Sequence, residues 1–236
     1  MNPAAKTLRR AAILFGTFIG SWFLFAYILA PFFWRSFAHL HPALDAAPTI
    51  TLTGDKHPGD PLNLALIGTR EEVEKIMRAA KWYAADPLGI RADVRIADDT
   101  ILKLPYDRAP VSSLFLFGRH QDLAFEQPVG GNPSQRHHVR FWQAGKLDGQ
   151  NRPLWFGSAT YDERVGLSYT TGQITHHIAG NVDAERDHVL ATLRQTGELA
   201  AVTYVDNFQR QRSGRNGGGD LWKTDGRLGL ATISKR

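Results

Sequence analysis

The chain has 236 residues and no cysteine, so a disulfide framework, a thiolate metal site and a cysteine nucleophile are all excluded. Its formal net charge is +5 and its pI is about 9.6, but the basic residues are concentrated at the two ends. Residues 45–207 contain 17 Lys and Arg against 21 Asp and Glu, whereas residues 208–236 contain seven basic residues against two acidic ones. A nucleic-acid-binding groove needs basic residues gathered on one face of the folded body, so we expect no nucleic acid as a partner.

Residues 11–34 read AAILFGTFIGSWFLFAYILAPFFW without a charged side chain, and about 20 such residues span a bilayer. The apolar region of a cleaved signal peptide is shorter, about 7–15 residues. We therefore predict a signal anchor that crosses the bilayer once and follows a basic head, residues 1–10.

Flanking charge predicts the orientation of this anchor. Three basic side chains precede the span and Arg35 follows it, which favours a cytoplasmic head and an exported domain. The expected location is the inner (cytoplasmic) membrane, with the C-terminal domain periplasmic or otherwise extracytoplasmic.

Residues 35–60 contain several prolines and glycines with little periodicity, and they are predicted to form a juxtamembrane linker. The run LNLALIG, residues 62–68, is typical of a buried strand. Thr69 is a candidate helix N-cap, because glutamates follow in the first turn and apolar residues recur at helical spacing. We expect one folded domain over residues 61–236.

A strand that carries two histidines is predicted over residues 135–142. The alternation of side chains along a strand places His138 and Arg140 on one face and His137 on the other. Residues 154–161 follow after a turn and are typical of the antiparallel neighbour in a β-hairpin.

A second pair of histidines lies in a third candidate strand, residues 174–178. His176 and His177 are adjacent, so they too face opposite sides. Because one histidine of each pair at most can face a single pocket, the set expected to act together is His138, Arg140 and His176.

A second helix is predicted to start at Asn181 or Asp183, either of which can cap it, and to end at about Gly197. Residues 200–205 are predicted to form a strand. The predicted fold is therefore α+β, an antiparallel sheet with at least two helices, preceded by one N-terminal transmembrane helix.

The C-terminal segment is rich in turn signals. Residues 212–219 include three consecutive glycines and are predicted to form a mobile loop. Residues 220–233 are predicted to form a last hairpin, because the dipeptide Asp225-Gly226 is a strong hairpin signal.

The leading hypothesis for the histidine strands is an anion-binding pocket formed where the two strands pair. Histidine acts as an acid, a base or a metal ligand near neutral pH, and arginine binds phosphate and carboxylate groups through two parallel hydrogen bonds. His138 and His176 are the candidate catalytic residues. The candidate ligand-binding residues are the nearby arginines, the other histidine of each pair and one further arginine: Arg136, Arg140, His137, His177 and Arg119.

Two alternatives use the same residues differently. A metal could bind between the two strands and the start of the second helix, through His138, His176, Asp183 and Glu185. No complete metal motif is present, however, so no metal site is predicted with these ligands alone. In a purely structural interpretation, one histidine of each pair packs in the core and the helix-start carboxylates serve only as caps.

Several short motifs resemble one family, in the same order along the chain. They are Asp60-Pro61-Leu62-Asn63, KWYAADP (81–87), Phe117-Gly118-Arg119, QDLAF (121–125), RHHVRFW (136–142), TGQITHHI (171–178) and DAERD (183–187). This series resembles the LssY-type C-terminal domain and covers about residues 61–204. In that family the domain is often joined to multispan modules of the lipid-phosphatase or DedA kind. The resemblance therefore implies a membrane-associated accessory role, but no phosphatase signature such as P-S-G-H is present, so lipid phosphatase activity is not implied.

These observations predict a membrane-anchored accessory or binding domain of the cell envelope that recognises an anionic group. A phospholipid or polyprenyl-phosphate headgroup is the expected ligand, and a membrane protein is a further candidate partner beside the bilayer itself. The alternative is a hydrolase of a phosphoester or related bond that uses the histidine pairs, with or without a metal.

Overall fold

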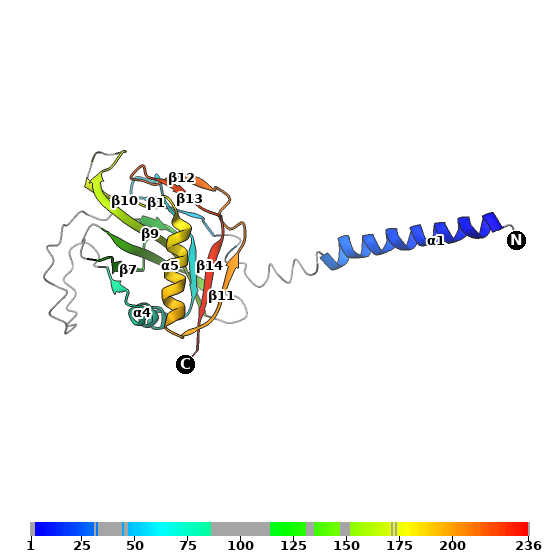
Figure 1. Cartoon of the computed structure of the whole chain (residues 1–236), viewed down its shortest axis with the longest axis horizontal. Coiled ribbons are helices and arrows are strands. Elements are labelled where there is room, and N and C mark those ends of the chain that lie inside the picture. The colour runs from blue at the N-terminus through cyan, green and yellow to red at the C-terminus, as the bar shows by residue number, and fades with distance from the viewer. Residues whose placement is uncertain are drawn as a thin grey trace.

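A computed structural model describes residues 3–30, 32, 44, 47–85, 114–130, 135–146, 152–170, 172 and 174–235. The N-terminal helix α1 (Pro3–Leu24) continues directly into a π-helical turn, η1 (Phe25–Leu29). Its segment Ala12–Leu29 has a mean hydropathy of 2.0, and none of this segment is buried (Figure 1). The helix is long and apolar enough to cross a bilayer, which is compatible with the predicted single-pass anchor. The last residues of the predicted span, 31, 33 and 34, lie outside the described residues.

A sheet of eight strands forms the centre of the domain. Its order is β11-β14-β3-β9-β8-β7-β4, and β10 pairs with the C-terminal part of β9. The strands are β3 (Leu64–Ile67), β4 (Tyr83–Ala84), β7 (Leu123–Pro128), β8 (Arg136–Lys146), β9 (Pro153–Leu167), β10 (Ile174–Ile178), β11 (Leu199–Val205) and β14 (Leu228–Ile233). Among the described strands of this sheet, only the β14–β3 pair is parallel, so the α+β class with a mainly antiparallel sheet is confirmed.

Two smaller sheets complete the β-structure. The first has the order β2-β1-β5-β6, with strands β1 (Ile50–Thr53), β2 (Pro58–Pro61), β5 (Leu114–Leu116) and β6 (Arg119–His120). The second is the hairpin of β12 (Ser213–Arg215) and β13 (Leu221–Lys223).

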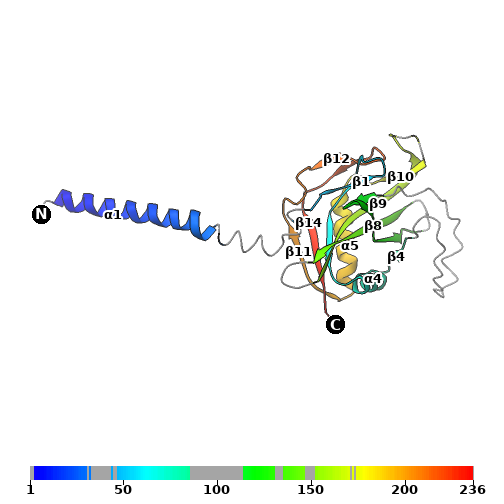
Figure 2. The same cartoon turned by 180° about the vertical axis from the view of Figure 1, so that it is seen from behind.

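The main sheet is covered on both faces. Helices α4 (Arg70–Ala79) and α5 (Val182–Gln195) pack on one face, where Leu64 and Leu66 of β3 join their apolar core. The alternate β3 residues, Ala65 and Ile67, face a second apolar core with residues of the four-stranded sheet. Figure 1 shows α5 in front of the main sheet, and in the reverse view of Figure 2 the strands β8 and β9 lie in front of α5.

Local sequence explains where the two domain helices begin. The Thr69 hydroxyl accepts a hydrogen bond from the Glu72 N–H and the Glu72 carboxylate accepts one from the Thr69 N–H, which is a complete capping box. The Asn181 side chain accepts hydrogen bonds from the first-turn amides of α5, so Asn181 is the cap of the two candidates. Both predicted helices are confirmed.

The predicted linker over residues 35–60 was wrong at its C-terminal end. β1 and β2 both fall inside it and pair with one another. The Thr51 hydroxyl also donates a hydrogen bond to the Asp60 carbonyl oxygen, at 2.8 Å. These strands have four residues each, which is too short for an alternating apolar pattern to stand out.

The predicted hairpin over residues 220–233 was also wrong. β13 pairs with β12, whereas β14 pairs with β11 and β3 of the main sheet. Asp225 lies between them and binds Arg186 of α5 at 2.9 Å, which directs the chain from one sheet to the other. Gly226, with φ of 83°, makes a turn there as expected, but the turn connects two sheets.

The glycine-rich stretch 212–219 is not an open loop. Its first part forms β12, and residues Asn216–Asp220 form a turn that is closed by a hydrogen bond from the Asn216 N–H to the Asp220 carbonyl oxygen, at 3.0 Å. This turn, which we call the glycine turn, borders the cavity described below.

Candidate functional site

The two histidine strands do not pair with each other. β8 pairs with β9 along one edge, and β10 pairs with the C-terminal part of β9 along the other edge. The predicted pocket between paired histidine strands was therefore wrong in its topology, because β9 separates them. β9 is long enough, at 15 residues, to reach β3 at one end and β10 at the other.

Alternation along β8 divides its polar residues as predicted. Val139 and Phe141 lie in the core beneath the helices, whereas Trp142 lies in the core that faces the four-stranded sheet. His138 and Arg140 share the face of Trp142, so they point between the two sheets.

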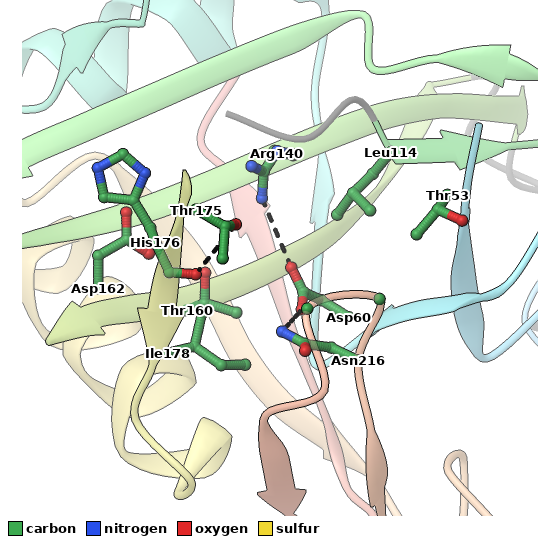
Figure 3. Close-up of a pocket in the computed structure, with 12 residues that line it drawn as sticks. Thr53, Asp60, Leu114, Arg140, Thr160, Asp162, Thr175, His176, Ile178 and Asn216 are labelled. Atoms are coloured by element: carbon green, nitrogen blue, oxygen red, sulfur yellow. Dashed lines mark hydrogen bonds and ion pairs between the residues drawn. The ribbon is translucent and has the colours of Figure 1, made fainter. Parts of the chain in front are cut away.

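A polar cavity of about 50 Å³ lies between the main sheet and the four-stranded sheet (Figure 3). Its wall comes from strands of both sheets and from the glycine turn: Thr53, Asp60, Leu114, Arg140, Thr160, Asp162, Thr175, His176, Ile178, Asn216, Gly217 and Gly218. One water molecule needs roughly 10–15 Å³ of such volume. The cavity can therefore hold a few waters or one group about the size of a phosphate or carboxylate.

Asp60 and Arg140 form a buried ion pair at one side of the cavity. The Arg140 Nη1 lies 3.6 Å from the Asp60 Oδ2, and the Asn216 amide donates a hydrogen bond to the Asp60 Oδ1 at 3.1 Å (Figure 3). Burial raises the pKa of Asp60 although Arg140 opposes the shift. Burial also lowers the pKa of Arg140. The Arg140 Nε is buried and has no hydrogen-bond partner.

Asp162 is a second buried carboxyl group in the cavity wall. It lies opposite Arg136 in the β8–β9 register, and the Arg136 Nε is 3.9 Å from its Oδ2. Burial raises the pKa of Asp162 to about 7, against the opposing effects of Arg140 and Arg136. Asp162 can therefore exchange a proton near neutral pH, which is the property required of a general acid or base.

His176 presents a donor that has no partner. Arg136 is a donor only, so its hydrogen bond to the His176 Nε2 at 3.0 Å places the imidazole proton on Nδ1. That Nδ1 is buried and unpaired. Burial and the neighbouring Arg136 and Arg140 lower the pKa of His176 to about 4, so the ring is neutral at pH 7.

His138 lies beside this cavity but not in its wall. It is buried, and its register partner Thr160 is one of the wall residues. Burial lowers the pKa of His138 well below its usual value, and Arg140, Arg136 and His176 lower it further. Of the set His138, Arg140 and His176, the structure places the last two in the wall and the first next to it.

His177 holds the glycine turn against the sheet. Its Nδ1 lies 2.6 Å from the Asp220 Oδ1 and its Nε2 lies 3.1 Å from the Leu167 carbonyl oxygen. The Asp220 Oδ2 also accepts a hydrogen bond from the Ile178 N–H. His177 therefore fixes the turn that forms one side of the cavity and does not face the cavity itself.

The remaining predicted residues lie elsewhere. On the helix side of the sheet, the His137 Nδ1 is 2.8 Å from the Glu185 Oε2, and the His137 ring stacks on His188 with centroids 3.8 Å apart. Arg119 forms an ion pair with Asp122 at 2.8 Å on the four-stranded sheet. Arg136 contacts His176 and, at 3.0 Å, Glu126.

The four candidate metal ligands do not converge. His138 and His176 lie on the cavity side of the sheet, whereas Glu185 binds His137 on the helix side. Asp183 binds Arg186 at 3.1 Å. Among the residues that the structure describes, no group of three or more His, Cys, Asp and Glu side chains could hold a metal ion.

Sequence reasoning did not single out the two cavity carboxylates. Asp60 was named only as part of a family motif, because the residues that form its strand were predicted to belong to the linker. Asp162 was missed because the predicted strand ended at residue 161. Extending that strand by one residue places Asp162 on the same face as Thr160, which is the signal that could have identified it.

Fold and cavity define a class of protein: an α+β domain with a small polar cavity between two sheets, in a chain that also carries one apolar N-terminal helix. The chain belongs to the LssY C-terminus family, whose family model matches residues 44–228. This match confirms the resemblance seen in the ordered motifs. No curated protein and no solved structure matches the chain significantly.

Proposed function

We propose that this chain is a membrane-anchored binding domain of the cell envelope whose cavity holds one singly charged oxyanion group. The observation that carries the proposal is a pair of buried donors without partners, the Arg140 Nε and the His176 Nδ1, on two residues of the cavity wall. An unpaired buried donor costs about 1–3 kcal/mol. A ligand oxygen that accepts from these donors removes that cost.

The charges around the cavity favour a monoanion over a dianion. Arg140 is paired with Asp60 and Arg136 with Glu126, so neither arginine brings an uncompensated positive charge. The ligand charge must therefore be balanced by a proton on Asp162, whose pKa of about 7 allows it. A phosphodiester, as in a phospholipid headgroup, fits this balance better than a terminal phosphate such as that of a polyprenyl phosphate.

Calorimetric titration of the full chain in detergent tests this proposal. The probes are a short-chain phosphatidylglycerol, farnesyl phosphate and inorganic phosphate. We expect the diester to bind most tightly, and its affinity to increase as the pH falls from 8 to 6 because Asp162 gains its proton.

The decisive variant combines Arg140→Lys with His176→Gln. It removes the Arg140 Nε and the His176 Nδ1 from their positions but keeps a positive charge beside Asp60 and a polar group beside Arg136. A hydrogen bond to a charged group is worth about 1.5–3 kcal/mol, so we expect a loss of affinity of at least about tenfold. His120→Gln, on the exposed strand β6, is the matched control. An unchanged affinity in the double variant would overturn the proposal.

A hydrolase of a phosphoester or related bond is the second candidate. Asp162 favours it, because a carboxyl group with a pKa of about 7, in the same cavity wall as a neutral histidine, can act as a general acid. The test is a phosphodiesterase and phosphatase screen, with metal analysis of protein purified without chelator or histidine tag. Turnover that Asp162→Asn abolishes, with ligand affinity retained, would replace the binding proposal.

The apolar helix supports a role at the bilayer. We propose that it is a single-pass signal anchor in the inner membrane and that the domain lies on the periplasmic side, since three basic residues precede its apolar segment, Ala12–Leu29. A membrane protein in the same bilayer is a further proposed partner, in keeping with an accessory role.

A further inference from the structure

Three exposed apolar side chains lie at one end of the domain. Leu167, Tyr169 and Leu221 are 64%, 66% and 57% exposed, more than any other large apolar side chain of the described domain residues. Leu167 ends β9, Tyr169 follows it, and Leu221 begins β13. Figures 1 and 2 both show β10 and the β12–β13 hairpin at this same end.

Specific contacts join these segments into one surface. The Tyr169 N–H donates a hydrogen bond to the Gly218 carbonyl oxygen at 2.9 Å. The Tyr169 side chain packs so closely on Gly219 that a Cβ there would lie 2.7 Å from it. His177 bridges Leu167 and Asp220, and its ring centroid is 4.9 Å from that of Tyr169. The surface is therefore held in place by the packed strands beneath it.

The exposed charges on the same segments are mainly basic. In residues 163–170 and 213–224 the exposed charged side chains are Arg164, Arg215 and Lys223 against one acid, Glu163. The Arg164 guanidinium donates to the Tyr169 hydroxyl at 2.8 Å, and the Arg215 guanidinium to the Gly219 carbonyl oxygen at 2.7 Å. We call Leu167, Tyr169, Leu221, Arg164, Arg215 and Lys223 together the docking face.

A surface that combines exposed apolar side chains with basic ones matches an anionic bilayer. The apolar groups enter the headgroup region and the basic groups contact lipid phosphates, each worth about 1 kcal/mol near an anionic surface. A bilayer would lie close to this surface, because the segment Ala12–Leu29 of the same chain is long and apolar enough to cross one.

From this match of charge and polarity, we propose that the docking face rests on the anionic surface of the membrane that holds α1. The proposal goes beyond the cavity's proposed function and does not require the cavity to bind anything. It has a consequence for the cavity, however. The glycine turn contacts Tyr169 and lines the cavity through Gly217 and Gly218, so docking brings the cavity wall close to lipid headgroups.

Single-cysteine labelling tests the docking face, because the natural chain has no cysteine. Leu221→Cys and, separately, Leu167→Cys carry an environment-sensitive fluorophore on the full chain in vesicles. The vesicles contain phosphatidylcholine alone or a mixture with phosphatidylglycerol. Phe117→Cys is the matched control, because Phe117 is also exposed but packs near Phe156, toward the other end of β9.

We expect severalfold brighter, blue-shifted emission at residues 221 and 167 in the anionic vesicles, quenched by a lipid-borne quencher, and no change at residue 117. Adding Arg164→Gln and Lys223→Gln should return the emission to its value in phosphatidylcholine. Thermal unfolding of each labelled chain verifies its fold.

Two results would overturn the proposal. One is equal emission at residues 221 and 167 in both kinds of vesicle. The other is emission that follows the density of protein in the membrane instead of lipid charge, which would show that a second copy covers the face. Neither result bears on the cavity, whose affinity for soluble ligands is measured separately.

Discussion

Asp162 and His176 line the same cavity but respond to pH in opposite directions. Burial raises the pKa of Asp162 to about 7, so the folded chain keeps a proton there that the unfolded chain loses near pH 4. Burial and Arg136 lower the pKa of His176 to about 4, so the folded chain excludes a proton that the unfolded chain binds below about 6.5. Asp162 therefore destabilises the fold as pH rises from 4 to 7, and His176 destabilises it as pH falls through the same range.

The Asp162→Asn variant separates these two effects. The amide of the variant cannot ionise. We therefore expect the free energy of unfolding of the variant to increase relative to that of the natural chain as pH rises from about 4 to about 7. A shift of about three pKa units corresponds to a gain on the order of 3–4 kcal/mol. Denaturant titrations at pH 4.5, 6 and 7.5 measure it. Asp55→Asn, in an exposed turn, is the control, and a constant difference between Asp162→Asn and the natural chain would contradict the assignment.

His177 has a structural role, to hold the glycine turn through Asp220, which the sequence pair His176-His177 does not indicate. His177→Ala removes the imidazole that contacts the buried Asp220 Oδ1, and breaking such a pair costs about 2–4 kcal/mol. We expect the melting temperature to fall by several degrees, whereas His120→Ala, on the exposed strand β6, should change it little. Circular dichroism during heating measures both. Equal melting temperatures for the two variants would show that the His177–Asp220 contact contributes nothing to stability.

At the scale of elements, the close packing of β9 against β8 depends on a glycine, Gly157, which lies against the Phe141 ring. A Cβ on Gly157 would lie 2.8 Å from the Phe141 ring and 3.3 Å from the Leu64 Cβ. We expect Gly157→Ala to lower the free energy of unfolding by about 1–3 kcal/mol, because the core must shift to accept the methyl group. Gly145→Ala is the matched control in β8, where an added Cβ meets nothing within 4 Å. Chemical denaturation of both variants decides whether the close approach matters.

Elements with local signals could be predicted from sequence, and those defined by distant partners could not. Gly68 and Thr69 mark the end of β3 and the start of α4 within a few residues, and Asn181 does the same for α5. The Asp225-Gly226 dipeptide gave the right turn but the wrong pairing. The local pattern carries no information about Arg186, which binds Asp225 from α5.

The candidate site shows the same division. Alternation alone placed His138 and Arg140 on one face, and that holds in the structure. The carboxylates could not be placed in the same way, because Asp60 reaches Arg140 from a different sheet and a distant part of the chain. Asn63 shows how buried amides escape detection. Its side chain bonds the Ala159 main chain and the Val182 carbonyl oxygen, joining β9 to the start of α5, yet a lone Asn in an apolar run gives no sign of this.

At the scale of the whole molecule, the side of the membrane is the prediction of broadest consequence. Three basic residues before the apolar segment Ala12–Leu29 predict export of everything after it. An alkaline phosphatase fused to the C-terminus should therefore be active, and a green fluorescent protein fused there should be dark. Replacing Lys6, Arg9 and Arg10 with glutamine should reduce the phosphatase signal. The opposite pattern of reporters would place the cavity and the docking face in the cytoplasm.

The parallel pair of β3 and β14 has a consequence for how the protein is made. Leu64, near the start of the domain, pairs with Gly229, near its end, and β3 lies in the middle of the main sheet. One edge of β3 therefore stays unpaired until β14 has been synthesised. The domain can complete its central sheet only after β14 has left the ribosome. A domain whose central sheet is still incomplete can pass through a translocation channel as an extended polypeptide.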